Sequence, residues 1–183
     1  MKVQVIYSSL SGCTRRLAEG IYAAIEAEEK QIWDLKDGEP ELDGDVILLG
    51  YWVDRGGPGE AMSRFMAKVT GKHVGVFCTL AFWADSAHAH SALHNGVQLL
   101  EPNNTVIGGY VCNGSLSQSM IQAFRQRGSG PHSASPANEA RWEVMKDHPT
   151  SSEIALAAER FGERLRLLEK LTAVGEAFPS ISI

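Results

Sequence analysis

The sequence has no apolar run near 20 residues, no basic stretch and no paired cysteine motif. Without such a run we expect no membrane insertion. There are 17 Lys or Arg residues against 22 Asp or Glu residues, a net charge of −5, so we expect no nucleic acid partner. Cys13, Cys78 and Cys112 are too widely spaced for a disulfide framework or a zinc motif. The first residues also lack a secretory layout, and we therefore expect a cytoplasmic protein with reduced thiols.

The length and composition predict one folded domain over residues 1–183. Hydrophobic residues make up 44% of the chain and charged residues 21%, close to the averages of globular proteins. A chain of 183 residues can bury a substantial core without disulfides or a structural metal. His90 and His94 are four residues apart, but a third ligand is missing, so we expect no metal site.

Short apolar runs alternate with longer amphipathic stretches along the chain. The predicted strands are 3–7, 31–33, 46–49, 73–77 and 105–111. Nearly continuous apolar runs are typical of strands that are covered on both faces. The run 31–33 is short and flanked by charges, which predicts an edge strand.

Helical spacing fills much of the sequence between these runs. The predicted helical stripes span 17–25, 62–69, 89–100, 116–124 and 154–168. Asp85 is the candidate N-cap of the third helix, and Thr150 to Glu153 form a capping-box pattern before the last. Alternating strands and helices predict an α/β fold with three layers, a doubly wound parallel sheet of five strands.

The segment 127–149 is rich in Gly, Ser, Pro and His, and we predict a long loop there with room for one short helix. If this loop covers a ligand site, Trp142 and Met145 are the residues that would form its lid.

The turn after the first strand carries a candidate anion site. The hydroxyls of Ser9, Ser11 and Thr14 can donate to phosphate oxygens, and Gly12 permits tight backbone geometry. The helix that follows supplies unpaired N–H groups and the positive end of its dipole. Neither GxGxxG nor GxxxxGK[ST] is present. The alternative interpretation is an ordinary hydroxyl-rich helix cap.

This turn resembles the phosphate loop of the flavodoxin family, whose usual form is Ser/Thr-x-Thr-Gly-Asn-Thr. Ser9, Gly12 and Thr14 match that form. The residues that depart from it are Leu10, Ser11 and Cys13. The resemblance continues through 49–52 and 77–80. Residues 50–56 and 79–88 are also similar to loops of a flavodoxin-like subgroup from mostly anaerobic bacteria.

The resemblance implies a flavodoxin-like sheet with strand order 2-1-3-4-5 and non-covalently bound FMN at the carboxyl ends of the strands. The first loop would hold the phosphate, and the loops after the third and fourth strands would enclose the isoalloxazine ring. No catalytic side chain is implied. The candidate cofactor-binding residues are Ser9, Leu10, Ser11, Gly12, Cys13, Thr14, Tyr51, Trp52, Val53, Arg55, Gly56, Thr79, Leu80, Ala81, Phe82 and Trp83.

Aromatic residues in these loops fit a flat ring. Tyr51 and Trp52 follow the third strand, and Phe82 and Trp83 follow the fourth. Packing in the core is the alternative role for Trp52, Phe82 and Trp83, above all for one member of the Phe82–Trp83 pair.

Arg55 is a candidate for tuning the flavin potential. A guanidinium near the flavin N1 would stabilise the reduced anion. The alternatives are that Arg55 points to water or pairs with Asp54 or Glu60.

The leading functional hypothesis is electron transfer through the bound flavin, with a larger redox protein as partner. A reductase of a small organic acceptor, of quinone or tetrapyrrole type, is the alternative. A non-redox ligand-binding module of the same fold is the third candidate, and a homodimer stays open. A phosphoacceptor receiver domain is excluded, because Tyr7-Ser8 and Gly50 stand where it needs acidic residues.

Overall fold

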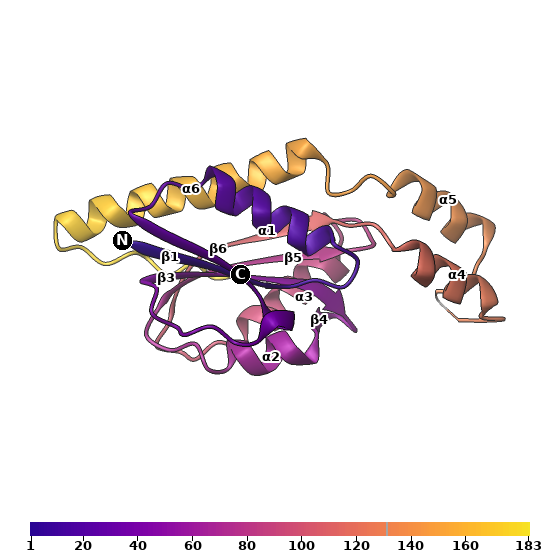
Figure 1. The fold of residues 1–183 in the computed structure, drawn as a ribbon, viewed down its shortest axis with the longest axis horizontal. Coiled ribbons are helices and arrows are strands. Elements are labelled where there is room, and N and C mark those ends of the chain that lie inside the picture. The colour runs from indigo at the N-terminus through magenta and orange to yellow at the C-terminus, as the bar shows by residue number, and fades with distance from the viewer. Residues whose placement is uncertain (131) are drawn as a thin grey trace.

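A computed structural model describes residues 1–130 and 132–183. Its centre is a parallel sheet in the order β2-β1-β3-β5-β6, with a short strand β4 (Gly57–Pro58) paired antiparallel to β3 (Figure 1). The five parallel strands are β1 (Lys2–Ser8), β2 (Glu29–Asp34), β3 (Val46–Asp54), β5 (His73–Leu80) and β6 (Thr105–Asn113). Counted along the chain, this is the predicted order 2-1-3-4-5, which is confirmed.

The burial pattern of each strand agrees with its place in the sheet. Residues 3–7 of β1 and 46–51 of β3 are buried without interruption, as expected for strands covered on both faces. In β2, exposed and partly buried residues alternate, and Trp33 is an exposed member of that set. The predicted edge position of this strand is confirmed.

Two helices cover each face of the sheet. Helices α1 (Cys13–Ala24) and α6 (Ser151–Ala173) pack against one face, and α2 (Glu60–Met66) and α3 (Ala87–Val97) against the other (Figure 1). Successive strand residues point to opposite faces, so Leu48 joins the core under α1 and α6 while Leu49 joins the core over α2.

The helix caps follow the sequence in one case and differ in another. Thr150 and Glu153 form the predicted capping box of α6. The N-cap of α3 is Ser86, whose hydroxyl accepts from the amide of Ala89 at 3.2 Å, and not Asp85 as predicted. Ser86 has the extended backbone of an N-cap and lies three residues before the amide that it serves, one residue closer than Asp85.

The crossover from β2 to β3 is a loop, preceded by a single 3₁₀ turn, η1 (Leu35–Asp37). Gln4, a buried side chain of β1, supports this loop from inside. Its amide nitrogen donates to the Glu41 carbonyl at 2.8 Å, and its oxygen accepts from the Gly44 amide at 2.9 Å. A loop stands here where the alternation of strands and helices would place a helix. Two of its backbone groups, at Glu41 and Gly44, pair with the Gln4 side chain.

Residues 115–149, which we call the arm, leave the sheet at the carboxyl end of β6. The arm contains α4 (Gln118–Gln126) and α5 (Pro136–Val144), and both helices extend beyond the sheet (Figure 1). Helix α5 is the short helix for which the predicted loop left room. Phe124 of α4 packs on α5, where its ring lies 6.0 Å from the ring of Trp142. None of the α4 residues is buried.

Within the residues that the structure describes, no helix is long and apolar enough to span a membrane.

Gly50 offers a test of the central packing. A Cβ at Gly50 would lie 2.3 Å from two ring carbons of Phe77, whose ring is fully buried and packs edge-on against Phe161. We expect Gly50→Ala to lower the free energy of unfolding by about 1–3 kcal/mol, measured by urea denaturation. At Gly128 a Cβ meets nothing within 4 Å, so Gly128→Ala is the control. A G50A protein as stable as wild type would contradict the packing described.

Candidate functional site

The loop between β1 and α1 leads into a helix start with a glycine N-cap, where the Ser9 hydroxyl accepts from the Arg15 amide at 3.2 Å. Gly12, the N-cap residue, has φ of 91° and makes no side-chain cap hydrogen bond. A Cβ at Gly12 would meet nothing within 4 Å, so space is open beside the first turn. Backbone amides at such a helix end are ready donors to an anion. The geometry is therefore that of a small anion cradle.

Thr14 does not point its hydroxyl into this cradle. Its side chain is fully buried, and its Oγ1 lies 2.9 Å from Oγ1 of Thr79 at the end of β5. Two of the predicted site residues thus hold each other beneath the site. In this arrangement only the backbone amide of Thr14 is left to serve an anion, and the hydroxyl ties the first loop to β5.

A cavity of about 80 Å³ lies at the carboxyl ends of the strands. Of the residues predicted from sequence, the structure brings to this cavity Leu10, Ser11, Cys13, Trp52, Val53, Thr79, Leu80 and Ala81. Sites for ligands of drug-like size are usually about 300–1,000 Å³. A flavin would therefore also occupy surface beside the cavity, where the exposed side chains of Leu10 and Trp83 lie on bordering loops.

Sequence reasoning missed four residues that line the cavity, Gly114, Ser115, Leu116 and Met120. They follow β6, and only the ends of the other strands were considered as sources of ligand contacts. The signal was present, since all parallel strands end at the same edge of the sheet. Leu116 and Met120 were instead assigned to a helical stripe facing the core.

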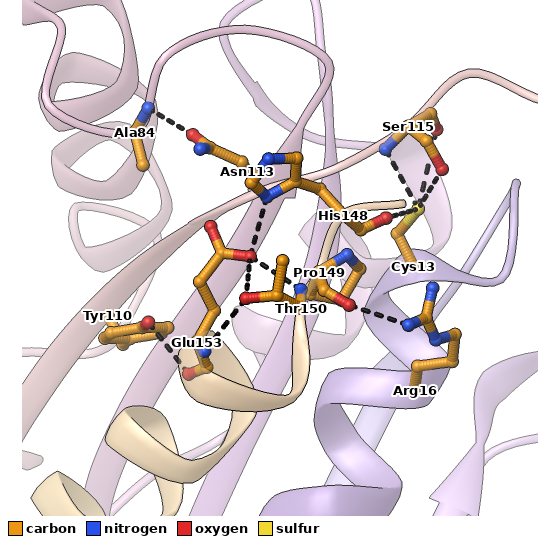
Figure 2. A network of polar contacts seen from close by, with 10 residues as sticks. All are labelled: Cys13, Arg16, Ala84, Tyr110, Asn113, Ser115, His148, Pro149, Thr150 and Glu153. Atoms are coloured by element: carbon orange, nitrogen blue, oxygen red, sulfur yellow. Dashed lines mark hydrogen bonds and ion pairs between the residues drawn. The ribbon is translucent and has the colours of Figure 1, made fainter. Parts of the chain in front are cut away.

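The sulfur of Cys13 joins the first loop to both ends of the arm (Figure 2). It accepts from the Ser11 hydroxyl at 3.3 Å and from the Ser115 amide at 3.2 Å. The carbonyl oxygens of Ser115 and His148 lie 3.4 and 3.5 Å away, and either one can accept the single thiol proton. The sulfur of Cys13 therefore joins the cradle to the arm through hydrogen bonds.

A second group of polar contacts fixes the segment that returns from the arm (Figure 2). One carboxylate oxygen of Glu153 accepts from the Thr150 amide at 2.6 Å and contacts Nδ1 of His148 at 2.7 Å. Arg16 of α1 donates to the Pro149 carbonyl at 2.7 Å. The arm therefore starts and ends at fixed points beside the site.

The two remaining cysteines lack the character of reactive thiols. Burial raises the pKa of the Cys78 thiol to about 12. Burial also raises the pKa of Cys112, with a smaller contribution from the nearby Glu153 carboxylate. Both thiols are protonated at neutral pH, and a protonated thiol is a poor nucleophile.

The aromatic candidates divide into buried and accessible rings. Tyr51 is fully buried, and its hydroxyl donates to the Ala92 carbonyl of α3 at 2.8 Å. Its ring therefore has no face open to a ligand. Trp52, its neighbour on the strand, lines the cavity. Phe82 packs edge-on against His88 at 6.4 Å, whereas Trp83 is 43% exposed.

Arg55 sits at the tip of a two-residue hairpin between β3 and β4. Its φ of 50° and the φ of 86° at Gly56 are the left-handed pair of a type I′ turn. Neither residue lines the cavity. Glu60, one of the partners considered, pairs with Arg64 at 2.9 Å. Arg55 is exposed, and within residues 1–130 and 132–183 it makes no ion pair with Asp54 or Glu60.

The comparisons with known proteins agree with this arrangement. The model of the family described as Flavodoxin domain matches residues 4–162. A flavodoxin-like domain-containing protein BilS from Clostridioides difficile is 26% identical over 155 residues, which cover 82% of this chain and 85% of that protein.

Solved structures share the fold. A Fusobacterium nucleatum flavodoxin bound to flavin mononucleotide superposes with a TM-score of 0.53 at 15% identity, covering 92% of this chain and 97% of that one. A flavone reductase gives a TM-score of 0.59 at 12% identity, covering 94% of this chain and 64% of that one. Because the family model spans well over half of the sequence, the chain belongs to the flavodoxin domain family.

Proposed function

We propose that this protein binds FMN at the carboxyl edge of its sheet and transfers electrons through it. The observation that carries the proposal is the convergence of the loop after β1 with the carboxyl ends of β3 and β5 on one cavity, beside the start of α1, whose N-cap residue is a glycine. The flavodoxin from Fusobacterium nucleatum, which shares the fold, is bound to flavin mononucleotide. Bound FMN would supply the redox chemistry, accepting and passing on one or two electrons.

The first loop would hold the phosphate without a lysine. Ser11 is exposed and lines the cavity, and Gly12 leaves open space beside the amides of the first turn of α1. The helix dipole adds a favourable field for an anion at this end. The Ser9 hydroxyl accepts from the Arg15 amide at 3.2 Å and keeps its own proton, but Ser9 does not line the cavity. Ser11 does line the cavity, so we assign it to the phosphate, where its hydroxyl would exchange the weak contact with the Cys13 sulfur for a phosphate oxygen.

The loops after β3 and β5 would hold the ring. Trp52 and Val53 line the cavity from one strand, and Thr79, Leu80 and Ala81 line it from the next. An indole face against the isoalloxazine adds stacking energy, and the apolar neighbours exclude water. Trp83 is on the exposed part of the same loop, available to cover the ring from outside.

Transfer to a larger redox protein is the primary proposal, and reduction of a small organic acceptor is the second candidate. The second is favoured by the arm, because Leu116 and Met120 bring apolar side chains from it to the cavity. Such a wall offers contacts to a small molecule beside the flavin. A non-redox role is the outcome if no flavin binds.

The phosphate assignment predicts a difference between FMN and riboflavin. Ser11→Ala removes one hydroxyl donor to the phosphate, so we expect FMN affinity to fall about tenfold. Riboflavin has no phosphate, and its affinity should stay unchanged. Both constants come from titrations followed by flavin fluorescence. A parallel loss for the two ligands would place Ser11 away from the phosphate.

The stacking assignment predicts a loss of FMN affinity when Trp52 is replaced and no loss when Trp33 is replaced. Trp52→Ala should weaken FMN binding by about threefold to tenfold, since ring stacking contributes about 0.5–1.5 kcal/mol. Trp33→Ala, on the edge strand β2, is the control and should leave the affinity unchanged. Flavin-induced quenching of tryptophan fluorescence gives the affinities. Equal affinities in the two variants would contradict the role of Trp52.

Arg55→Glu tests the electrostatic effect of the hairpin. Reversing this charge disfavours the reduced anionic flavin, so the hydroquinone potential should fall. The residue is exposed, and solvent limits the effect to about 10–40 mV. Arg64→Glu reverses a charge on α2 and is the control. Potentials are measured by dye-coupled titration. An identical shift in both variants would assign the effect to net charge and contradict a local role.

A further inference from the structure

The geometry points to Arg141 as a binding site for an anionic group, of carboxylate type, on a flat organic acceptor. This inference rests on the proposed function and deepens its second candidate, because it names the chemistry of the molecule that the flavin would reduce. Arg141 lies on α5 of the arm, far along the chain from the phosphate loop.

Ring contact fixes the guanidinium of Arg141 at the rim of the site. Its Cζ lies 5.2 Å from the centre of the Phe82 ring, a cation–π geometry. Phe82 directly follows Ala81, which lines the cavity. The arm that carries Arg141 is attached beside the cavity at both ends, through Cys13 to Ser115 and His148. The guanidinium is therefore held in place before any ligand arrives.

Among residues 1–130 and 132–183, the side-chain hydrogen-bond donors of Arg141 meet no acceptor. Its Nε is buried and without an acceptor, and within the described parts of the chain no hydrogen bond or ion pair involves its terminal nitrogens. The nearby acids are occupied elsewhere. Glu139 accepts two hydrogen bonds from Arg125 at 2.7 and 2.6 Å, and Glu143 pairs with Lys146 at 2.5 Å. The cation is half-buried and unpaired, and its terminal amino groups are free for a ligand.

A guanidinium recognises a carboxylate through two parallel N–H···O bonds. Burial of Nε leaves the two terminal nitrogens as the pair that can present this fork. Contact with the Phe82 ring already restricts the Arg141 side chain, so less side-chain freedom is lost on binding.

The neighbouring surfaces add the apolar half of the ligand. Trp83 and Leu10, on the loops that border the cavity, are 43% and 55% exposed. Leu116 and Met120 line the cavity from the arm. A flat apolar body with one carboxylate would satisfy both the cation and these side chains.

The half-buried position favours a small acid over a protein partner. Arg127, on the same arm, also lies over a ring, with its Cζ 5.1 Å from the centre of Phe124, but it is exposed. An acidic protein surface would reach Arg127 more easily than Arg141. Arg127 is therefore the matched control, with the same charge and the same kind of ring contact.

The experiment uses the full chain loaded with FMN and two probes, anthraquinone-2-carboxylate and its uncharged amide. Binding is followed by fluorescence quenching at low and at high salt, in wild type, Arg141→Met and Arg127→Met. Methionine keeps apolar contact with the Phe82 ring while removing the charge. Arg141→Gln is a second variant that keeps polar character without charge.

We expect wild type to prefer the carboxylate over the amide about tenfold. Both Arg141 variants should lose this preference, and Arg127→Met should keep it. The amide should bind equally to all four proteins. An unchanged preference in the Arg141 variants, as a protein partner for Arg141 would give, overturns the inference. So does an equal loss in Arg127→Met, which would reflect net charge only.

The flavin spectrum separates this inference from the proposed function. Failure of wild type to bind FMN contradicts the proposed function itself. Binding of FMN to all variants, with no preference for the carboxylate in any of them, overturns the Arg141 inference and leaves flavin binding intact.

Discussion

The parallel register of β1, β3 and β5 determines where every part of the site can lie. Ser8 is level with Tyr51, and Trp52 is level with Thr79. The three strands therefore end within three residues of one another, and the loops that follow them meet over one edge of the sheet. A one-residue slip of β3 would move each of its side chains to the opposite face of the sheet. Tyr51 would leave the α3 face and Trp52 would take its place. The core contacts of Tyr51 with α3 oppose such a slip.

This constraint explains which site residues could be predicted from the sequence. The apolar runs located the strands, and topology then placed their following loops at one edge. Cys13 at the start of α1 and Ala81 after β5 could be predicted in this way. Tyr51 was placed among the ring-binding residues because its strand was expected to end at Leu49, whereas β3 continues to Asp54. Within a strand, Tyr51 and Trp52 must point to opposite faces.

The arm could not be predicted, since its contacts join residues far apart in the sequence. Cys13 meets Ser115 and His148, which are 102 and 135 residues away. The local sequence pattern indicates only that α4 is amphipathic. The same apolar stripe can pack against a sheet or against another helix. The expected lid residues show the same limit. Trp142 and Met145 are 6% and 2% exposed, so they consolidate the arm and do not present a surface to a ligand.

Burial decides which of the arginines near the site can act strongly on a ligand. Arg55 is exposed at a hairpin tip, where water and salt screen its charge within about 10 Å. Arg141 is half-buried against Phe82, where the effective dielectric is lower and the same charge acts more strongly. Sequence reasoning favoured Arg55 because it is close in sequence to the ring-binding loop. The fold brings Arg141 to the neighbouring loop through the arm, and its unpaired donors make it the stronger recognition element.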